Sequence, residues 1–391
     1  MDLQSYFADL HIHIGKDWNG RPVKISGGKS LTVTNVLKEA SRRKGMDIVG
    51  VIDAHVPEVQ AELEEFLTKG HAKEHKDGGV CFENTLLILG SEIEIYDINC
   101  RGPIHVLCFF PFLSVMKDFS SWLATRMTNI NLSSQRFYGT AEELQKCVKD
   151  FGGWFIPAHV FTPFKSMYGK GVDKSLTDVF DATMIDAVEL GLSSDTEMAD
   201  QISELHVFPF LSNSDAHSLN KIGREYQEVL LEELSFYELG LAIKGKSERK
   251  INHNYGMNPR LGKYHQTVCN HCQKNLSVYQ TPCPNCGSKK VIKGVAERIN
   301  ELSTNSVNHP SRPPYIYQVP LEYLPSLGPK TYEKLLERFG TEMDVIHHAS
   351  LEELQQVVPE KLAGAILRLR NGDVAIEAGG GGRYGKLKGD S

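Results

Sequence analysis

Histidine and carboxylate side chains recur at short, regular spacings in the first 243 residues. Asp9, His11 and His13 alternate along one apolar segment, and Asp215 and His217 repeat the two-apart spacing near the other end of this region. Residues two apart in an extended strand point to the same face. Neutral imidazoles and carboxylates are the groups that hold Zn²⁺, Mn²⁺ and Fe²⁺ in proteins. The spacing therefore predicts a metal site.

Other ionisable residues stand within or just after the apolar segments of the same region. A single histidine on a strand is more often a buried core residue than a ligand. Burying many such groups without partners costs a large free energy, and a metal cluster removes that cost. The number of these groups therefore supports the prediction. The further candidate ligands are Asp17, Asp53, His55, Glu92, His105 and His159.

Apolar segments alternate with helix-like segments through residues 1–243, which predicts an α/β fold with a mainly parallel sheet. About seven strands suit a closed or nearly closed barrel. The predicted strands are Phe7–Ile14, Ile48–Ile52, Leu86–Ile95, Ile104–Phe110, Trp154–Ile156, Ala187–Leu190 and Val207–Leu211. Helix-like segments between them include Thr34–Lys44, Glu58–Lys69, Ala141–Lys149 and Asp195–Leu205.

The ends of parallel strands share one face, so ligands that are distant in the sequence can converge there. His105 is an exception, because it lies near the start of its predicted strand.

The segments DLHIH, PAH and SDAH, with Glu92 and His105, resemble the PHP (polymerase and histidinol phosphatase) superfamily over residues 1–243. The resemblance implies a distorted seven-stranded (β/α) barrel with two or three divalent ions, which can be Zn, Mn, Fe or Mg. It implies one ion on the catalytic residues His11, His13, Glu92 and Asp215. Glu92 would bridge to a second ion on His105 and His159, and His217 would hold a third with residues of the second motif.

The second motif departs from the adjacent Asp-His that is usual in the PHP superfamily. It reads Asp53-Ala54-His55, so either Asp53 or His55 can be the ligand. Asp17 follows His13 at slightly short spacing for a further ligand. Paired ions activate a bridging water and clamp the attacked phosphate. The sequence contains no Ser-His-Asp motif or phosphate loop that competes for this role.

Four cysteines form the pattern C-x2-C-x10-C-x2-C, which predicts one structural zinc in a closed tetrahedral site. Two paired copies argue against a redox C-x-x-C. The four are Cys269, Cys272, Cys283 and Cys286. The remaining cysteines are scattered in apolar surroundings, where we expect reduced, buried thiols.

The net charge of −6 conceals an asymmetry along the chain. Residues 1–243 have 22 Lys/Arg and 35 Asp/Glu, whereas residues 244–315 have 12 and 3. Basic side chains with interleaved aromatic rings favour nucleic acid over a solvated loop that contacts nothing. The candidate basic contacts in this segment are Lys263, Lys289 and Lys290.

A Leu-Gly-Pro-Lys turn precedes a helical segment near the C-terminus and resembles the turn of a helix-hairpin-helix module. Backbone N–H groups at such a turn bind phosphate without reading sequence. Leu327, Gly328 and Lys330 are the candidates there, and residues 358–363 look like a degenerate second copy. A purely structural helical hairpin is the alternative.

The order of these parts resembles the endonuclease Q family. The predicted domains are a barrel (1–243), a basic linker with a zinc ribbon (244–315), a small all-α helix-hairpin-helix-like module (316–377) and a disordered tail (378–391). The resemblance implies a DNA-repair endonuclease that uses metal-activated water to cut 5′ to a deaminated base (uracil, hypoxanthine, xanthine) or an abasic site. The partner is double- or single-stranded DNA with damaged bases.

A damaged base would be extruded into a pocket beside the metals. The candidates for its walls are Phe161, Phe164, Tyr168, Tyr255 and Tyr264. The alternatives are a PHP-type small-molecule phosphatase, a general metal-dependent nuclease and a DNA-binding factor. The N-terminus has no secretory signal, and no apolar run is long enough to span a membrane, so we expect a cytoplasmic protein. We also expect the chain to be a monomer.

Overall fold

A mixed sheet forms the body of the computed structural model. Its central strand, β1 (Gln4–Ile12), is parallel to β2 (Ile48–Val51), which is parallel to β5 (Thr85–Ile95). β6 (Ile104–Phe110) runs antiparallel to β5 and to β8 (Trp154–Pro157). The α/β class is confirmed, but the expectation of a mainly parallel sheet is corrected at β6. The described residues are 2–304, 309–373, 375–380 and 383–387.

Two short strands connect β8 back to β1. The N–H of Val160, beyond β8, donates to Glu189 O at 3.0 Å, and β9 is parallel to β10. Beyond β10, the N–H of His13 donates to Ala216 O at 3.1 Å. The strands that follow one another in space are thus β1, β2, β5, β6, β8, β9 (Val188–Glu189) and β10 (Phe210–Leu211).

Further strands extend the sheet on both sides of this series. β11 (Tyr226–Leu231) is antiparallel to β1, and β12 (Lys250–Gly256) is antiparallel to β11. β12 pairs with β15 (Tyr315–Tyr317), so strands beyond residue 243 belong to the same sheet. At the other edge lie β3 (Lys73–Glu74), β4 (Val80–Phe82) and β7 (Arg136–Phe137).

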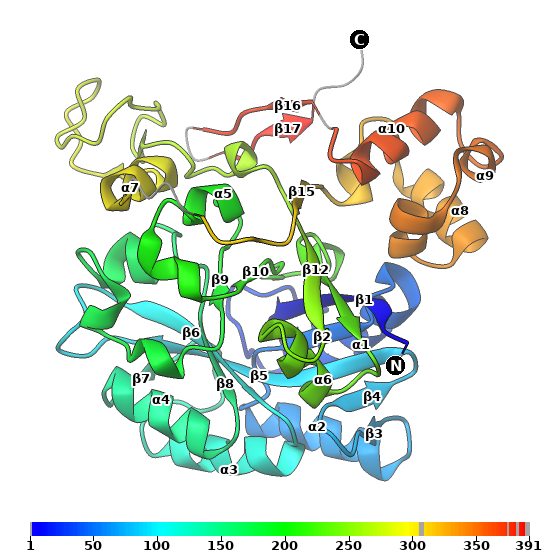
Figure 1. Cartoon of the computed structure of the whole chain (residues 1–391), viewed down its shortest axis with the longest axis horizontal. Helices are drawn as coiled ribbons and strands as arrows, with labels where there is room; N and C mark the ends of the chain where they lie inside the picture. The colour runs from blue at the N-terminus through cyan, green and yellow to red at the C-terminus, as the bar shows by residue number, and fades with distance from the viewer. Residues whose placement is uncertain (1, 305–308, 374, 381–382, 388–391) are drawn as a thin grey trace.

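Helices pack against these strands, and α2, α3 and α4 lie together along one side of them (Figure 1). Thr140 Oγ1 accepts the N–H of Glu143 and fixes the start of α4, because a capping side chain satisfies a free first-turn N–H. The helices are α1 (Val33–Glu39, continued by a wider turn at Ala40–Lys44), α2 (Pro57–Thr68), α3 (Leu113–Ala124), α4 (Ala141–Asp150), α5 (Thr196–Ala199) and α6 (Phe236–Ile243).

Alternation along the strands separates an apolar layer from a polar one. Ile88 and Glu92 share one face of β5, and Leu107 and His105 share one face of β6. The apolar members belong to one buried cluster, and burial of each such side chain contributes about 1.5–3 kcal/mol. This cluster therefore holds in place the strand ends that carry the polar residues.

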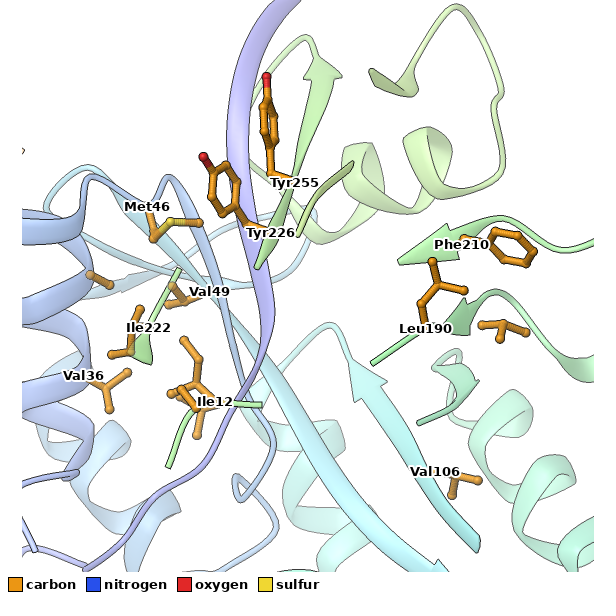
Figure 2. Packing of buried hydrophobic residues seen from close by; sticks show 14 of the residues in the cluster. Ile12, Val36, Met46, Val49, Val106, Leu190, Phe210, Ile222, Tyr226 and Tyr255 are labelled. Atoms are coloured by element: carbon orange, nitrogen blue, oxygen red, sulfur yellow. The ribbon is translucent and has the colours of Figure 1, made fainter. Parts of the chain in front are cut away.

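A second buried cluster lies around these strands and extends to the C-terminal helices. Figure 2 shows part of it, including Ile12 of β1 and Val36 of α1. Tyr226 and Tyr255, from neighbouring strands, stack with ring centroids 4.9 Å apart (Figure 2).

The four-cysteine segment contains a short hairpin of β13 (Val268–Cys269) and β14 (Val291–Ile292), followed by α7 (Val295–Leu302). Arg298 of α7 fixes this segment to the body of the molecule, donating to Tyr168 O at 2.8 Å and to Asp173 O at 2.7 Å. The segment projects beyond α7 at the upper left of Figure 1.

The C-terminal helices pack beside α1 (Figure 1). Lys44 Nζ lies 2.5 Å from Glu342 Oε2, and the two side chains are 4% and 3% exposed. The ring of His347 stacks on Phe7 at 4.5 Å. A 3-10 turn (Leu321–Tyr323) precedes α8 (Pro329–Phe339), and the turn Asp344–His348, α9 (Leu351–Gln355) and α10 (Glu360–Arg370) follow.

The region predicted as a disordered tail is described in part. β16 (Ile376–Glu377) pairs with β17 (Lys386–Leu387), whereas residues 381–382 and 388–391 lie outside the described residues. Among the described helices, none is long and apolar enough to cross a membrane.

Lys44→Met should weaken the docking of the C-terminal helices. The substitution leaves the buried Glu342 carboxylate without its cation, which costs about 3–5 kcal/mol. Hydrogen exchange across α8 measures the effect. Arg43→Met is the matched control, because its pair with Glu333 is exposed and contributes at most about 1 kcal/mol. Equal protection of α8 in the two variants would contradict this assignment.

Candidate metal centre and nucleic-acid interface

His11 of β1 and His13, directly after it, each place their two ring nitrogens in different surroundings. His11 Nδ1 lies 2.9 Å from Glu189 Oε1, and His13 Nδ1 lies 3.1 Å from Asp53 Oδ2. A carboxylate that accepts the Nδ1 proton selects the tautomer in which Nε2 keeps its lone pair. Both Nε2 atoms are buried without a hydrogen-bond partner among the described residues.

Two carboxylates face these nitrogens. Glu92 Oε1 is 3.6 Å from His11 Nε2, and Glu92 Oε2 is 3.6 Å from His13 Nε2. Asp215 Oδ1 lies 3.5 Å from His11 Nε2 and 3.6 Å from His13 Nε2. Two imidazole nitrogens and two carboxylates converge, as four-coordinate divalent cation sites require. His217 borders this group, with Nε2 3.2 Å from Asp215 Oδ1.

Glu92 also faces a second pair of histidines. Its Oε1 lies 2.8 Å from His105 Nδ1 and 3.3 Å from His159 Nε2. His105 reaches this place because β6 is antiparallel to β5. The start of β6 therefore lies beside the end of β5, where His105 pairs with Glu94. His105 thus lies at the start of its strand, unlike the other candidates, because that strand runs antiparallel to β5.

Both central carboxyl groups are ionised despite their surroundings. Burial by itself raises the pKa of Glu92, but the charges of His105 and Lys24 outweigh it and hold that pKa well below its usual range. Burial likewise raises the pKa of Asp215, and the nearby His11 and His13 lower it well below the usual range. Ionised carboxylates beside buried imidazoles are the donors that a divalent cation needs.

Two of the candidate ligands have an uncommon backbone conformation. His159 has φ 31° and Asp215 has φ 45°, positive values that cost a non-glycine residue about 1–3 kcal/mol. Hydrogen bonds hold both segments: His159 N–H donates to Glu189 Oε2 at 2.8 Å, and Arg224 Nη2 donates to Asp215 O at 3.2 Å. These hydrogen bonds thus hold His159 and Asp215 in a strained backbone conformation at the point where the candidate ligands converge.

The donor set fits divalent metal ions. Three overlapping groups have all their ligand atoms within 4.8 Å of one another: His11, His13 and Glu92; His13, Asp215 and His217; Glu92, His105 and His159. Buried nitrogens without hydrogen-bond partners cost free energy. A cation that accepts their lone pairs removes this cost. Imidazole and carboxylate donors together suit Zn²⁺, Mn²⁺ or Fe²⁺.

Three sequence-predicted ligands lie outside these groups. Asp17 Oδ1 accepts the N–H groups of Asn19 and Arg21, at 2.9 and 2.8 Å, within its own loop. Asp53 Oδ2 accepts the N–H of Ile14 at 2.7 Å besides facing His13. His55 has Nδ1 2.8 Å from Ser91 Oγ and Nε2 3.3 Å from Leu132 O. The structure therefore places Asp17, Asp53 and His55 outside the three groups, while Asp53 Oδ1 is buried without a hydrogen-bond partner among the described residues.

The sequence reasoning missed two residues at this centre. Glu189 is a buried carboxylate that faces His11 and accepts from Asn213 Nδ2 at 2.8 Å. A charged residue inside the apolar segment 187–190 was a usable signal for it. Lys24 Nζ lies 3.1 Å from Glu92 Oε2. No spacing in the sequence distinguishes Lys24 from other loop lysines, because the folding of its loop brings it to the site.

The four ribbon cysteines have the geometry of a closed metal site. Cys269 Sγ is 3.6 Å from Cys286 Sγ, and Cys272 Sγ is 3.9 Å from Cys283 Sγ. Four sulfurs at about 2.3 Å from a tetrahedral zinc are about 3.8 Å apart. The backbone N–H of Lys274 lowers the pKa of Cys272 to about 6, which favours the thiolate that binds zinc.

The five aromatic candidates for a base pocket separate into two sets. Phe161, Tyr168 and Tyr255 are buried in the hydrophobic core, so their rings are not available to a base, which corrects that prediction. Phe164 is 43% exposed and meets the partly exposed Tyr264 edge to face at 5.4 Å. Only this pair of the five offers ring surface to a ligand.

Basic side chains surround a hollow between the ribbon and the loop after His159. The hollow has a volume of about 490 Å³, and Phe164, Lys170, Tyr279 and Lys293 are among its lining residues. Lys289 and Lys290, which are close to Lys293 in the sequence, are exposed on the ribbon. Lys263 Nζ lies 5.4 Å from the ring centre of Tyr264. The arrangement offers cations and aromatic rings on one surface.

The Leu-Gly-Pro-Lys turn leads directly into α8. Gly328 is the residue that caps this helix, is exposed, and has no atom within 4 Å of where a Cβ would lie. Lys330 is exposed in the first turn, whereas Leu327 is buried and anchors the turn. First-turn N–H groups lack partners within their helix.

The chain is similar to known proteins along almost its whole length. A family model described as the MJ0043 C-terminal domain matches residues 329–373. The uncharacterized protein YqxK of Bacillus subtilis (strain 168) is 54% identical over 386 residues, which are 99% of this chain and 100% of that protein.

Two crystal structures resemble the fold closely. The novel lesion-specific endonuclease PfuEndoQ from Pyrococcus furiosus has a TM-score of 0.83 and 34% identity, covering 98% of this chain and 95% of that one. Endonuclease Q in complex with a 27-mer duplex substrate, with an abasic lesion at the active site, has a TM-score of 0.83 and 33% identity, covering 99% and 97%.

The fold and the converging imidazoles and carboxylates define a metal-dependent hydrolase that acts on phosphodiester bonds. Since the identities exceed 30% over nearly the full length of both chains, this chain belongs to the endonuclease Q family.

Cys269→Ser should lose one zinc per chain, because the site then lacks a thiolate and metal binding supplies the folding energy of such a module. Elemental analysis of the purified variant measures the loss. Cys147→Ser is the control, since Cys147 is half-buried and outside every metal-compatible group of the described residues. Unchanged zinc content in Cys269→Ser would exclude a zinc site at these cysteines.

Proposed function

We propose that this chain is a DNA-repair endonuclease that hydrolyses the phosphodiester bond on the 5′ side of a deaminated base or an abasic site. The observation that supports it most is the set of overlapping imidazole–carboxylate groups centred on Glu92. The closely matching endonuclease Q has an abasic lesion at its active site. We extend this substrate class to uracil, hypoxanthine and xanthine in duplex or single-stranded DNA.

His11, His13, Glu92 and Asp215 would hold one divalent ion, and Glu92 would bridge to a second ion on His105 and His159. Bound ions of this kind activate a water molecule and polarise the attacked phosphate. Zn, Mn, Fe and Mg are all compatible with this donor set. The cysteine ribbon would hold one structural zinc.

The carboxylates behind the histidines would orient the ligands. Glu189 fixes the ring of His11, and Asp53 fixes the ring of His13, through their Nδ1 atoms. Partners of this kind keep a ligand nitrogen aimed at the cation, and their loss weakens metal affinity by about 10–100-fold. Asp53 thus acts on the metal through His13 rather than as a ligand.

We propose that the seven successive strands constitute the distorted barrel of the PHP superfamily and that the turn before α8 has the role of a helix-hairpin-helix. Lys263, Lys289 and Lys290 would neutralise backbone phosphates on the ribbon side. Gly328 and Lys330 would bind the backbone on the other side. These contacts fix the position of the strand without reading its sequence.

An undamaged duplex hides its bases, so the enzyme would extrude the damaged one at a cost of a few kcal/mol. Extrusion is easiest at a missing or mispaired base, which favours abasic sites and deaminated bases. The hollow beside Phe164 would receive the base, and the Phe164–Tyr264 pair would supply stacking surface.

The decisive assay uses end-labelled duplexes with one abasic site, one uracil, one hypoxanthine or no lesion. We expect a single nick on the 5′ side of each lesion in Mn²⁺ or Mg²⁺, with a ligatable 3′-hydroxyl, and no cutting after EDTA treatment. Asp215→Asn should cut more slowly by orders of magnitude, because it removes a ligand. Equal cutting of the undamaged duplex would leave a general nuclease, and hydrolysis of p-nitrophenyl phosphate alone would indicate a phosphatase.

Gly328→Val should weaken DNA binding about tenfold, since a hydrogen bond to a charged phosphate contributes about 1.5–3 kcal/mol. A Cβ atom added at Gly328 has no protein atom within 4 Å, so the loss would come from the ligand that the new side chain excludes. Fluorescence anisotropy with a labelled duplex gives the Kd, and barrel metal content should not change. Gly364→Ala in α10 is the control, and equal affinity of both variants would remove the turn from the interface.

A further inference from the structure

Lys24 lies in the loop between β1 and α1, and the loop is fixed at this residue. Its N–H donates to Ile14 O at 2.9 Å, and its carbonyl oxygen accepts the N–H of Gly27 at 2.9 Å. The side chain is only 15% exposed. Its Nζ lies 3.1 Å from Glu92 Oε2 and 2.6 Å from Ser134 Oγ. A lysine ammonium therefore stands inside the candidate metal centre.

The centre is open on the side where Lys24 lies. The side chains of Asp215 and His217 are 32% and 35% exposed, whereas His11 and Glu92 are 0% and 1% exposed. A phosphate that enters from this exposed side meets Asp215, His217 and the loop that carries Lys24, whose Ser26 Oγ lies 3.1 Å from His217 Nδ1. An ammonium has three donors. The described part of the chain provides acceptors for two of them, which leaves one for an incoming oxygen.

The group that could hold a further cation on this side, His13, Asp215 and His217, shares His13 with the group His11, His13 and Glu92. Asp17 binds its own loop, and both ring nitrogens of His55 have partners within the protein. The Oδ2 atom of Asp53 is engaged by His13 and by the N–H of Ile14, whereas its Oδ1 atom is buried without a hydrogen-bond partner among the described residues. His217 faces the central carboxylate of Asp215, with Nε2 3.2 Å from Oδ1.

We propose that Lys24 is a catalytic residue that donates to an oxygen of the scissile phosphate, in the place where a third metal ion would otherwise supply positive charge. The inference rests on the proposed function. A fixed cation at this position attracts the phosphate and stabilises the additional negative charge of the transition state. Ser134, which bonds to both Lys24 and Glu92, holds the ammonium in place.

The test compares wild-type protein with Lys24→Met and Lys24→Arg. Lys29→Met is the matched control, because Lys29 is an exposed residue of the same loop. Metal content is measured by elemental analysis after reloading, affinity for inorganic phosphate by calorimetry, and the rate by single turnover on the abasic duplex. Thermal unfolding and circular dichroism verify that each variant is folded.

We expect two barrel ions and one ribbon zinc in every variant. Lys24→Met should bind phosphate about tenfold more weakly and cut about 10²–10³-fold more slowly, the loss typical of one transition-state donor. Lys24→Arg should retain most of the phosphate affinity, and Lys29→Met should match the wild type.

A third barrel ion in the wild type, or loss of barrel metal in Lys24→Met, would overturn the proposal, since Lys24 would then serve only to hold Glu92. Unchanged phosphate affinity in Lys24→Met would also overturn it. If the wild type does not cut the abasic duplex, the proposed function fails, while metal content and phosphate affinity still decide the role of Lys24.

Discussion

The whole centre depends on one buried carboxylate, Glu92. Its oxygens are 2.8–3.6 Å from the nitrogens of five basic side chains: His11, His13, Lys24, His105 and His159. A buried charge is tolerated only when such partners surround it. These partners come from several strands and from the segments that connect them. All of these segments must therefore bring their side chains to Glu92. The direction of β6, the strained backbone at His159 and the fold of the loop before α1 are all consistent with this requirement.

The strands around this centre make that arrangement rigid. An apolar layer fills the space next to the polar one and includes Leu10, Ile88 and Leu107. Behind the histidines, Glu189 and Asp53 hold the imidazole rings from the side away from Glu92. Preorganisation of this kind means that the ligands need not rearrange when a cation or a phosphate arrives.

Two outer parts are attached to this body by different interactions. The ribbon is held by hydrogen bonds from Arg298 to backbone carbonyls of the loop after His159. The C-terminal helices are held by the buried Lys44–Glu342 pair and by the stacking of His347 on Phe7. Both attachments fix the position of these outer parts relative to the candidate metal centre.

The sequence by itself determined the α/β class, the strands that carry the central histidines and the four-cysteine cluster, because spacing and hydrophobic alternation are local properties. Residue identity alone did not separate ligands from the residues that orient them: Asp53 and His55 have the right chemistry but are bonded elsewhere. The antiparallel course of β6 and the approach of Lys24 to Glu92 were decided only by the tertiary structure. Both depend on which segments become neighbours, and that choice balances the gain from burying apolar surface against the cost of burying charge over the whole molecule.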